Sequence, residues 1–272
     1  MKHNNYSIVL SRSRHAADCT LAPASQRGGG ADGAFSLIEL FVVMGVVSIL
    51  AVVTSGAIFA ARAAAAQSKC ASNLRMMATA AIAYAEEHHG EFPWGSRNAN
   101  NEFVCWDFIT AKDGSVRPGE MWSGYGINSV MQCPGYLGGN ANWKNNPYTG
   151  YNYNCSFIGK VSGDSGKRTT PARLSQLKVP SQTALFGDGQ YSGGANKFMR
   201  SPKGDAEHDR SSKSIRLAGT QGFRHRGKTN MAFCDGHVET LVKAYDYGGK
   251  EGFSAPGCGF VSADNALYSL EK

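Results

Sequence analysis

Cysteines are the side chains of this sequence best suited to covalent or metal chemistry, and the chain has seven of them. Cys19 lies in the polar N-terminal stretch, and removal of that stretch leaves six. An even set fits disulfide bonds in an extracytoplasmic compartment, although the sequence cannot choose the pairing. The spacings lack the Cys-x-x-Cys pairs that are typical of structural zinc sites. The candidates for disulfides are Cys70, Cys105, Cys133, Cys155, Cys234 and Cys258.

A loop near residue 207 groups oxygen ligands of the kind that calcium prefers. Asp205, Glu207 and Asp209 are its candidate ligands. Basic residues flank this loop, and the mixture of charges also fits a solvated loop without an ion. Calcium is therefore the one cofactor that the sequence suggests, and no other metal is expected.

His225 and the pair Asp235-Gly236 are separated by nine residues. Asp235 suits the turn that Asp-Gly predicts, and His225 can bond to nearby backbone, so both are expected to be structural. No Ser/His/Asp spacing, His–Glu metal motif or phosphate-binding loop stands out. We therefore expect a protein that is not an enzyme; a periplasmic hydrolase would need activity that depends on His225 or Asp235.

Glu39 is the single carboxylate at the head of a long apolar run. No charged side chain occurs from Leu40 to Ala61, and about 20 apolar residues span a bilayer as a helix. Basic residues precede this run, which by the positive-inside rule predicts a single-pass protein with its body across the membrane. A carboxylate within such a span costs about 2–3 kcal/mol and needs a partner. The alternative is that Glu39 lies at the membrane interface.

The elements that position these residues begin with one long helix. Beyond Arg62 apolar residues recur at intervals of three and four, which predicts an amphipathic helix, and Gly90 is a plausible C-cap. We expect one helix from Phe35 to His89, with a transmembrane half at 35–61 and an amphipathic half at 62–90. The expected buried stripe is Cys70, Leu74, Met77, Ala78, Ala81, Ile82 and Ala85.

The rest of the chain, 91–272, predicts a loop-rich body of antiparallel sheet, so the fold class is α+β. Cys133 and Cys155 are a candidate pair within it. A buried strand is expected at 182–189. A hairpin is expected at 229–241 with a two-residue turn at Asp235-Gly236, which places Phe233 opposite Val238 and Met231 opposite Thr240.

The stretch Gly33-Ala34-Phe35-Ser36-Leu37-Ile38-Glu39-Leu40 resembles the class III signal of type IV pilins and type II secretion pseudopilins. The resemblance implies that a prepilin peptidase cuts between Ala34 and Phe35, removes the leader 1–34 and methylates Phe35. It also implies that Glu39 pairs with the amine of Phe35 in a neighbouring subunit during assembly. Ala34 departs from the Gly that is usual there, and the leader is long for this class.

The spacing of His225 from Asp235-Gly236 resembles the H-X9-DG motif of a branch of pilin-like proteins common in planctomycete-type bacteria. The implied function is a structural subunit of a type IV pilus or a type II secretion pseudopilus. Its implied location is the bacterial inner membrane, with the body in the periplasm and at the cell surface or in the pseudopilus after assembly. Its implied partners are the peptidase, other pilin or pseudopilin subunits, the inner-membrane assembly platform and membrane lipid.

Two other interpretations compete with this one. A membrane-tethered module that never polymerises would bind a surface or polysaccharide through Trp- and Tyr-rich loops. An ordinary secretory signal would be cut after Ala63–Ala66, but its apolar region should be shorter and lack a carboxylate. Specific nucleic-acid binding is not expected, because the net charge of +7 comes without a dense Lys/Arg run.

Overall fold

The computed structural model describes most of the chain after residue 35. The described residues are 36–122, 132–137, 147–191, 194–203, 212–247 and 255–271. The chain divides into two compact units, one up to Val52 and one from Val53 onward. The predicted processing residues Gly33, Ala34 and Phe35 and the calcium candidates Asp205, Glu207 and Asp209 lie outside the described residues.

Helix α1 spans Leu37–Glu87, so the single long helix predicted from the sequence is confirmed within the described residues. A capping box starts it: the Ser36 hydroxyl accepts the Ile38 N–H at 3.3 Å, and Glu39 accepts the Ser36 N–H at 3.0 Å. Gly90 has φ +82° and donates its N–H to Ala85 O at 2.7 Å. This left-handed residue ends the helix, as predicted.

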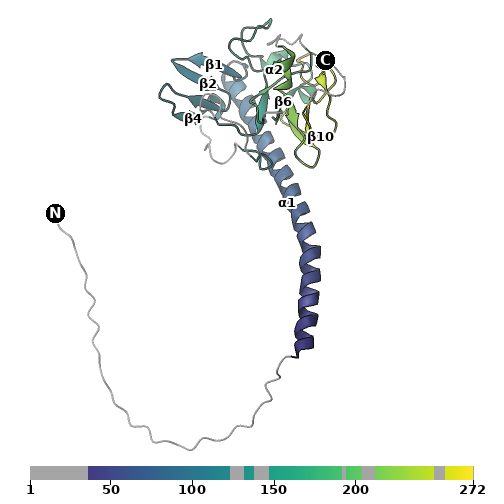
Figure 1. Ribbon diagram of the computed structural model, residues 1–272. Helices are drawn as coiled ribbons and strands as arrows, with labels where there is room; N and C mark the ends of the chain where they lie inside the picture. The colour runs from purple at the N-terminus through teal and green to yellow at the C-terminus, as the bar shows by residue number, and fades with distance from the viewer. Residues whose placement is uncertain are drawn as a thin grey trace, which may run out of the picture. The chain divides into compact units, whose positions relative to one another are not determined.

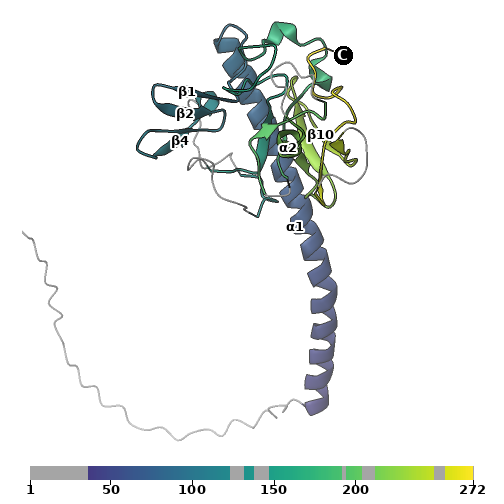
Figure 2. The same cartoon turned by 45° about the horizontal axis from the view of Figure 1, so that its top comes forward.

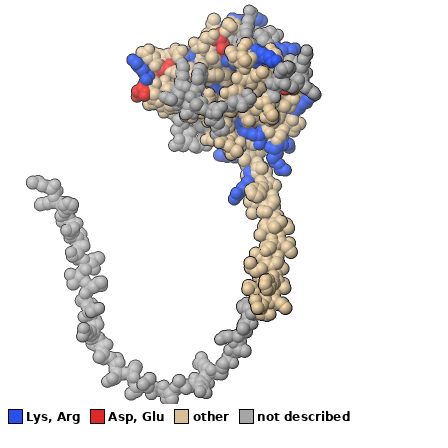
Figure 3. Space-filling view, viewed as in Figure 1, with Lys and Arg blue, Asp and Glu red and all other residues tan. Residues whose placement is uncertain are grey.

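The first part of α1 has its apolar side chains exposed. Leu37, Phe41 and Val52 are 73%, 72% and 74% exposed, and similar side chains surround them. No charge interrupts residues 40–61, and the face of this segment seen in Figure 3 carries neither Lys/Arg nor Asp/Glu. By length and composition, α1 is long and apolar enough to cross a membrane.

The second part of α1 supplies one wall of the core of the second unit. The predicted stripe is confirmed, with Ile82 only half-buried. Full burial of side chains such as Leu74 and Met77 contributes about 1.5–3 kcal/mol each. The buried residues of α1 are Cys70, Asn73, Leu74, Met77, Ala78, Ala80, Ala81 and Ala85.

Short strands form three sheets in the described part of the body, and the α+β class is confirmed at this level. The strands are β1 (Ser96–Ala99), β2 (Glu102–Cys105), β3 (Phe108–Thr110), β4 (Val116–Pro118), β5 (Tyr151–Asn154), β6 (Ala184–Asp188), β7 (Phe198–Met199), β8 (Gln221–Gly222), β9 (Thr229–Phe233), β10 (Val238–Leu241) and β11 (Cys258–Gly259). The sheet orders are β1-β2-β3-β4, β10-β9-β6-β5-β7 and β11-β8. All pairings of these strands are antiparallel except β5 with β7.

The two larger sheets lie on opposite sides of the second half of α1 in both ribbon views (Figures 1 and 2). Strand β6, predicted at 182–189, is confirmed, and every residue of β5, β6 and β9 is buried. Burial on both faces explains why these strands do not alternate between polar and apolar residues. Short helices lie between strands elsewhere along the chain: η1 (Glu120–Trp122) after β4, η3 (Leu174–Gln176) and η4 (Pro180–Gln182) between β5 and β6, and α2 (Lys213–Leu217) between β7 and β8.

The predicted hairpin exists, but its predicted register is wrong by one residue. Ala232, not Phe233, lies opposite Val238, and Met231 lies opposite Glu239. The Phe233 N–H donates to His237 O at 3.0 Å, and Gly236 has φ +90°. These features define a three-residue loop with a glycine bulge, in place of the two-residue turn that Asp-Gly favours in short hairpins.

A buried ion pair links the loop before β3 to the start of β7. Lys197 Nζ donates to Asp107 Oδ2, and the two side chains are 1% and 0% exposed. Lys197 Nζ also donates to Pro147 O at 2.5 Å, while Lys197 O accepts the Trp106 indole N–H at 2.9 Å. Because water cannot screen these charges, each depends on the other for its stability in the core.

Lys197→Met should lower the free energy of unfolding by about 3–5 kcal/mol, because it leaves the buried Asp107 carboxylate without its cation. Replacement of both partners, with Asp107→Leu added, should recover most of that loss. The measurement is thermal or denaturant unfolding of the full chain in detergent, followed by tryptophan fluorescence. Arg117→Met is the control, since the Arg117–Glu102 pair at 2.7 Å is exposed and should matter little. Equal losses of unfolding free energy in Lys197→Met and Arg117→Met would contradict the prediction.

Candidate functional site

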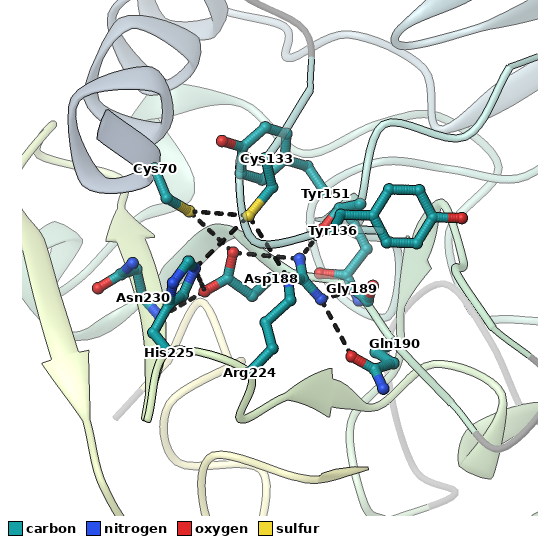
Figure 4. Close-up of polar contacts among 12 residues, drawn as sticks. Cys70, Cys133, Tyr136, Tyr151, Asp188, Gly189, Gln190, Arg224, His225 and Asn230 are labelled. Carbon is teal, nitrogen blue, oxygen red and sulfur yellow. Dashed lines mark hydrogen bonds and ion pairs between the residues drawn. The ribbon is translucent and has the colours of Figure 1, made fainter. Parts of the chain in front are cut away.

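Four chemically active side chains converge at one buried point in the second unit (Figure 4). They are Cys70, Cys133, Asp188 and His225, which we call the four-residue cluster. Each offers one ligand atom, and these atoms all lie within 4.8 Å of one another. The side chains of Cys70 and Asp188 come together across 118 residues of sequence. Tertiary folding alone therefore creates the cluster.

Three of these residues are placed by regular elements. Cys70 lies on the buried face of α1, and Asp188 ends β6. His225 lies in the turn between β8 and β9, where it exchanges backbone hydrogen bonds with Lys228 at 3.1 and 3.2 Å. Arg226 and Gly227 between them have φ of 58° and 77°. Two successive positive φ angles are those of a type I′ turn, and this turn directs the His225 ring inward (Figure 4).

Cys133 is held by a tight turn. Its N–H donates to Thr149 O at 2.9 Å, and its carbonyl accepts the Tyr136 N–H at 2.9 Å. Gly135 in this turn lies against the His225 ring, where a Cβ would come within 2.8 Å of His225 Cε1. A side chain at 135 would displace the ring, so the glycine permits the close approach of Cys133 and His225.

The contacts within the four-residue cluster form a closed ring. The sulfur atoms of Cys70 and Cys133 are 3.5 Å apart, and Cys133 Sγ is 3.5 Å from His225 Nε2. The Cys70 thiol donates to Asp188 Oδ1 at 3.0 Å. His225 Nε2 lies 3.4 Å from Asp188 Oδ2. Each of the four side chains thus contacts two others.

Arg224 supports the cluster from one side. Its Nη2 donates to Asp188 Oδ1 at 3.2 Å, and its Nε donates to Cys133 Sγ at 3.4 Å. The guanidinium also donates to the carbonyls of Gly150 and Gly189, which fix its plane. The Asn230 N–H completes the shell of Asp188, donating to Oδ2 at 2.8 Å.

These contacts shift the protonation equilibria of the cluster. The contact with Cys70, helped by His225 and Arg224, lowers the pKa of the Cys133 thiol to about 5, against the effect of burial. Burial is the main cause that raises the pKa of Cys70. Burial alone would lower the pKa of His225, yet its contacts with Asp188 and Cys133 raise it to about 9. Burial alone would raise the pKa of Asp188, but His225 and Arg224 lower it.

The sequence named three of the four residues and missed the fourth. Cys70, Cys133 and His225 were candidates, but for disulfides and for a family motif. Asp188 enters the sequence analysis only as part of the buried strand expected at 182–189. A carboxylate at the end of an otherwise apolar strand was the available signal, because such a group must find partners when it is buried. Asp235 plays its predicted turn role, accepting the His237 N–H at 3.1 Å.

The six cysteines predicted to form disulfides are all buried thiols in the structure. The sulfurs of Cys70 and Cys133 touch each other. Cys155, the partner suggested for Cys133, lies beside Gly95, where a Cβ would be 2.6 Å from its sulfur. The disulfides stay a prediction, and Cys70 with Cys133 is a pair that the structure brings into contact.

Comparisons with protein-family models, curated proteins and solved structures find no significant match to this chain. The functions proposed below therefore depend on the residues and geometry of this protein. The arrangement of thiols, carboxylate and imidazole suits three chemistries: an ion-pair network, a disulfide, and ligation of a divalent metal.

Arg224→Gln should destabilise the protein by about 3 kcal/mol, because the buried Asp188 carboxylate loses its permanent cation. Arg226→Gln is the matched control. Arg226 lies two residues further along, in the turn that carries His225, and it is exposed, so its replacement should change the unfolding transition very little. Both full-length variants would be compared with the parent chain by thermal unfolding in detergent. A similar loss in both would show that the turn itself, not the guanidinium at the cluster, determines stability.

Proposed function

We propose that this chain is a pilin-like structural subunit of the bacterial inner membrane, assembled with other subunits through its N-terminal helix. The observation that carries the proposal is α1 itself. Its first part exposes apolar side chains on all sides and is uncharged after Glu39, whereas its second part buries one face in the body. An anchor that continues into a core helix is the architecture that this function requires.

The exposed apolar surface in the first part of α1 must be shielded from water. Removal of apolar area from water is favourable by about 25 cal/mol per Å², and a helix that is apolar on all sides is stable only within a membrane or among other helices. Lipid covers it before assembly in the proposed function, and neighbouring α1 helices cover it afterwards. The prepilin peptidase and an inner-membrane assembly platform would be the partners for these two stages.

Glu39 caps its own helix and can accept further hydrogen bonds. Its Oε2 accepts the Ser36 N–H in the capping box, and an acid in the first turn is favoured by the helix dipole. A carboxylate has further acceptor sites, and at the edge of an apolar span these require a donor. The amine of Phe35 of a neighbouring subunit, released by cleavage after Ala34, is the partner we propose. Such a pair would fix the axial register of adjacent helices.

The placement of the aromatic residues argues against the tethered binding module. That alternative needs exposed Trp and Tyr, but Trp106, Trp122, Tyr151 and Tyr153 are buried. Trp94 is half-buried. Within the described part of 91–272 the large exposed apolar residues are Leu137, Ile215 and Val242, which are not aromatic. The four buried side chains stabilise the body from within and offer no stacking surface to a sugar.

Co-expression with a prepilin peptidase should shorten the protein to a mature chain that begins with N-methylated Phe35. Intact-mass measurement and N-terminal peptide analysis would test this, with a catalytically inactive peptidase as the control. The cut should appear only with the active enzyme, because the motif is its substrate. An intact leader, or a cut near Ala66, would overturn the processing step and with it the pilin-like assignment.

Glu39→Gln should reduce incorporation into filaments about tenfold or more, since it removes the charge while an amide can still accept the Ser36 N–H. Ser48→Ala is the matched control, because it removes a polar side chain from the same apolar segment without a change of charge. Sheared filaments and membranes would be quantified separately by immunoblot. Full incorporation of the Glu39 variant would remove the proposed register contact.

A further inference from the structure

We propose that Cys70, Cys133, Asp188 and His225 form a buried, four-ligand site for a divalent metal ion of the zinc type. Two sulfurs, one imidazole nitrogen and one carboxylate oxygen are a ligand set that suits zinc, and sites filled by four protein ligands are structural rather than catalytic. The proposal does not depend on the pilin-like function, because it rests on a cluster within the second unit.

Three of the six distances between the ligand atoms are close to those around a tetrahedral ion, and all six are within 4.8 Å. With Zn–S of about 2.3 Å and Zn–N or Zn–O of about 2.1 Å, a tetrahedron has edges of about 3.8 Å for S–S, 3.6 Å for S–N and 3.4 Å for N–O. The structure has 3.5 Å between the sulfurs, 3.5 Å from Cys133 Sγ to His225 Nε2 and 3.4 Å from Nε2 to Asp188 Oδ2.

The directions of the ligand atoms point to a common centre. His225 Nε2 faces both Cys133 Sγ and Asp188 Oδ2, although one ring nitrogen carries at most one proton. Cys70 Sγ likewise faces both Cys133 Sγ and Asp188 Oδ1. Hydrogen bonds alone cannot satisfy each of these pairs fully. A cation at the centre of the four side chains (Figure 4) would accept one lone pair from each of them.

The charges balance once Arg224 is included. Two thiolates and the Asp188 carboxylate carry three negative charges, while a divalent ion and the Arg224 guanidinium carry three positive ones. Neutral His225 adds none. This balance matters because Cys70, Cys133 and Asp188 are each 0% exposed and His225 is 3% exposed, and buried charge is tolerated only when it is compensated. Metal binding requires deprotonated thiols and a neutral imidazole, and it involves no redox step.

The surroundings supply the outer contacts that metal ligands usually have. Arg224 donates to both Asp188 Oδ1 and Cys133 Sγ, and the Asn230 N–H donates to Asp188 Oδ2. Such contacts orient ligands and hold a carboxylate in one position. A disulfide between Cys70 and Cys133 would use only two of the four groups, whereas a metal ion would use all four.

The test begins with the unaltered full chain, purified in detergent after expression with Zn²⁺. Elemental analysis should find about one zinc per chain, and X-ray absorption should show sulfur at about 2.3 Å and nitrogen or oxygen at about 2.0–2.1 Å. Exchange for Co²⁺ should give the absorption of a tetrahedral cobalt–thiolate site. These measurements need no variant, so they stay decisive even if substitutions prevent folding.

Cys70→Ser and His225→Gln should each lower the bound zinc to background levels, a loss greater than the roughly 100-fold that outer contacts cause. Cys258→Ser is the matched control, because Cys258 is a buried cysteine outside the cluster, and it should keep the full zinc content. Retention of zinc in both ligand variants would overturn the proposal. So would a zinc-free parent chain after incubation with Zn²⁺, whether mass analysis finds free thiols or a Cys70–Cys133 disulfide peptide.

Discussion

The buried carboxylate of Asp188 is the constraint on which the centre of the body depends. Burial of an ion costs several kcal/mol unless partners compensate it, and Asp188 lies at the end of β6, between β5 and β9. Donors reach it from separate segments: the thiol of Cys70, the guanidinium of Arg224, the ring of His225 and the N–H of Asn230. Each of these segments must adopt one position for the carboxylate to be satisfied.

Helix α1 continues from a segment with exposed apolar side chains to a segment with one buried face. Up to Ala61 its side chains are apolar on every side, and exposure of such a surface is favourable only beside lipid or other apolar helices. From Cys70 to Ala85 only one face is apolar, and that face is buried in the second unit. One unbroken helix therefore joins a segment with exposed apolar side chains to a segment that forms part of the core.

The four-residue cluster gives the second half of α1 a polar attachment in addition to its apolar packing. Cys70 contacts Asp188 of β6 directly, and through Cys133 it is connected to the turn that carries His225. Apolar contacts are non-directional, so they resist sliding of a helix less well than directional contacts do. If α1 is the element through which subunits assemble, such an attachment would keep the body in register with its helix. A metal ion at the centre would strengthen it further.

The sequence by itself determined the features that arise from local pattern. The helix, its buried stripe, the end at Gly90 and strand β6 all follow from periodicity and from the conformational freedom of glycine, which act over a few residues. Register in the β9–β10 hairpin was predicted wrongly, because the sequence Asp-Gly fits either a two-residue turn or a three-residue loop with a bulge. Only the tertiary structure decided that choice, and only it brought Cys70, Cys133, Asp188 and His225 together. Their meeting depends on how α1, two turns and β6 pack, and packing of segments far apart in the chain leaves no periodic signal in the sequence.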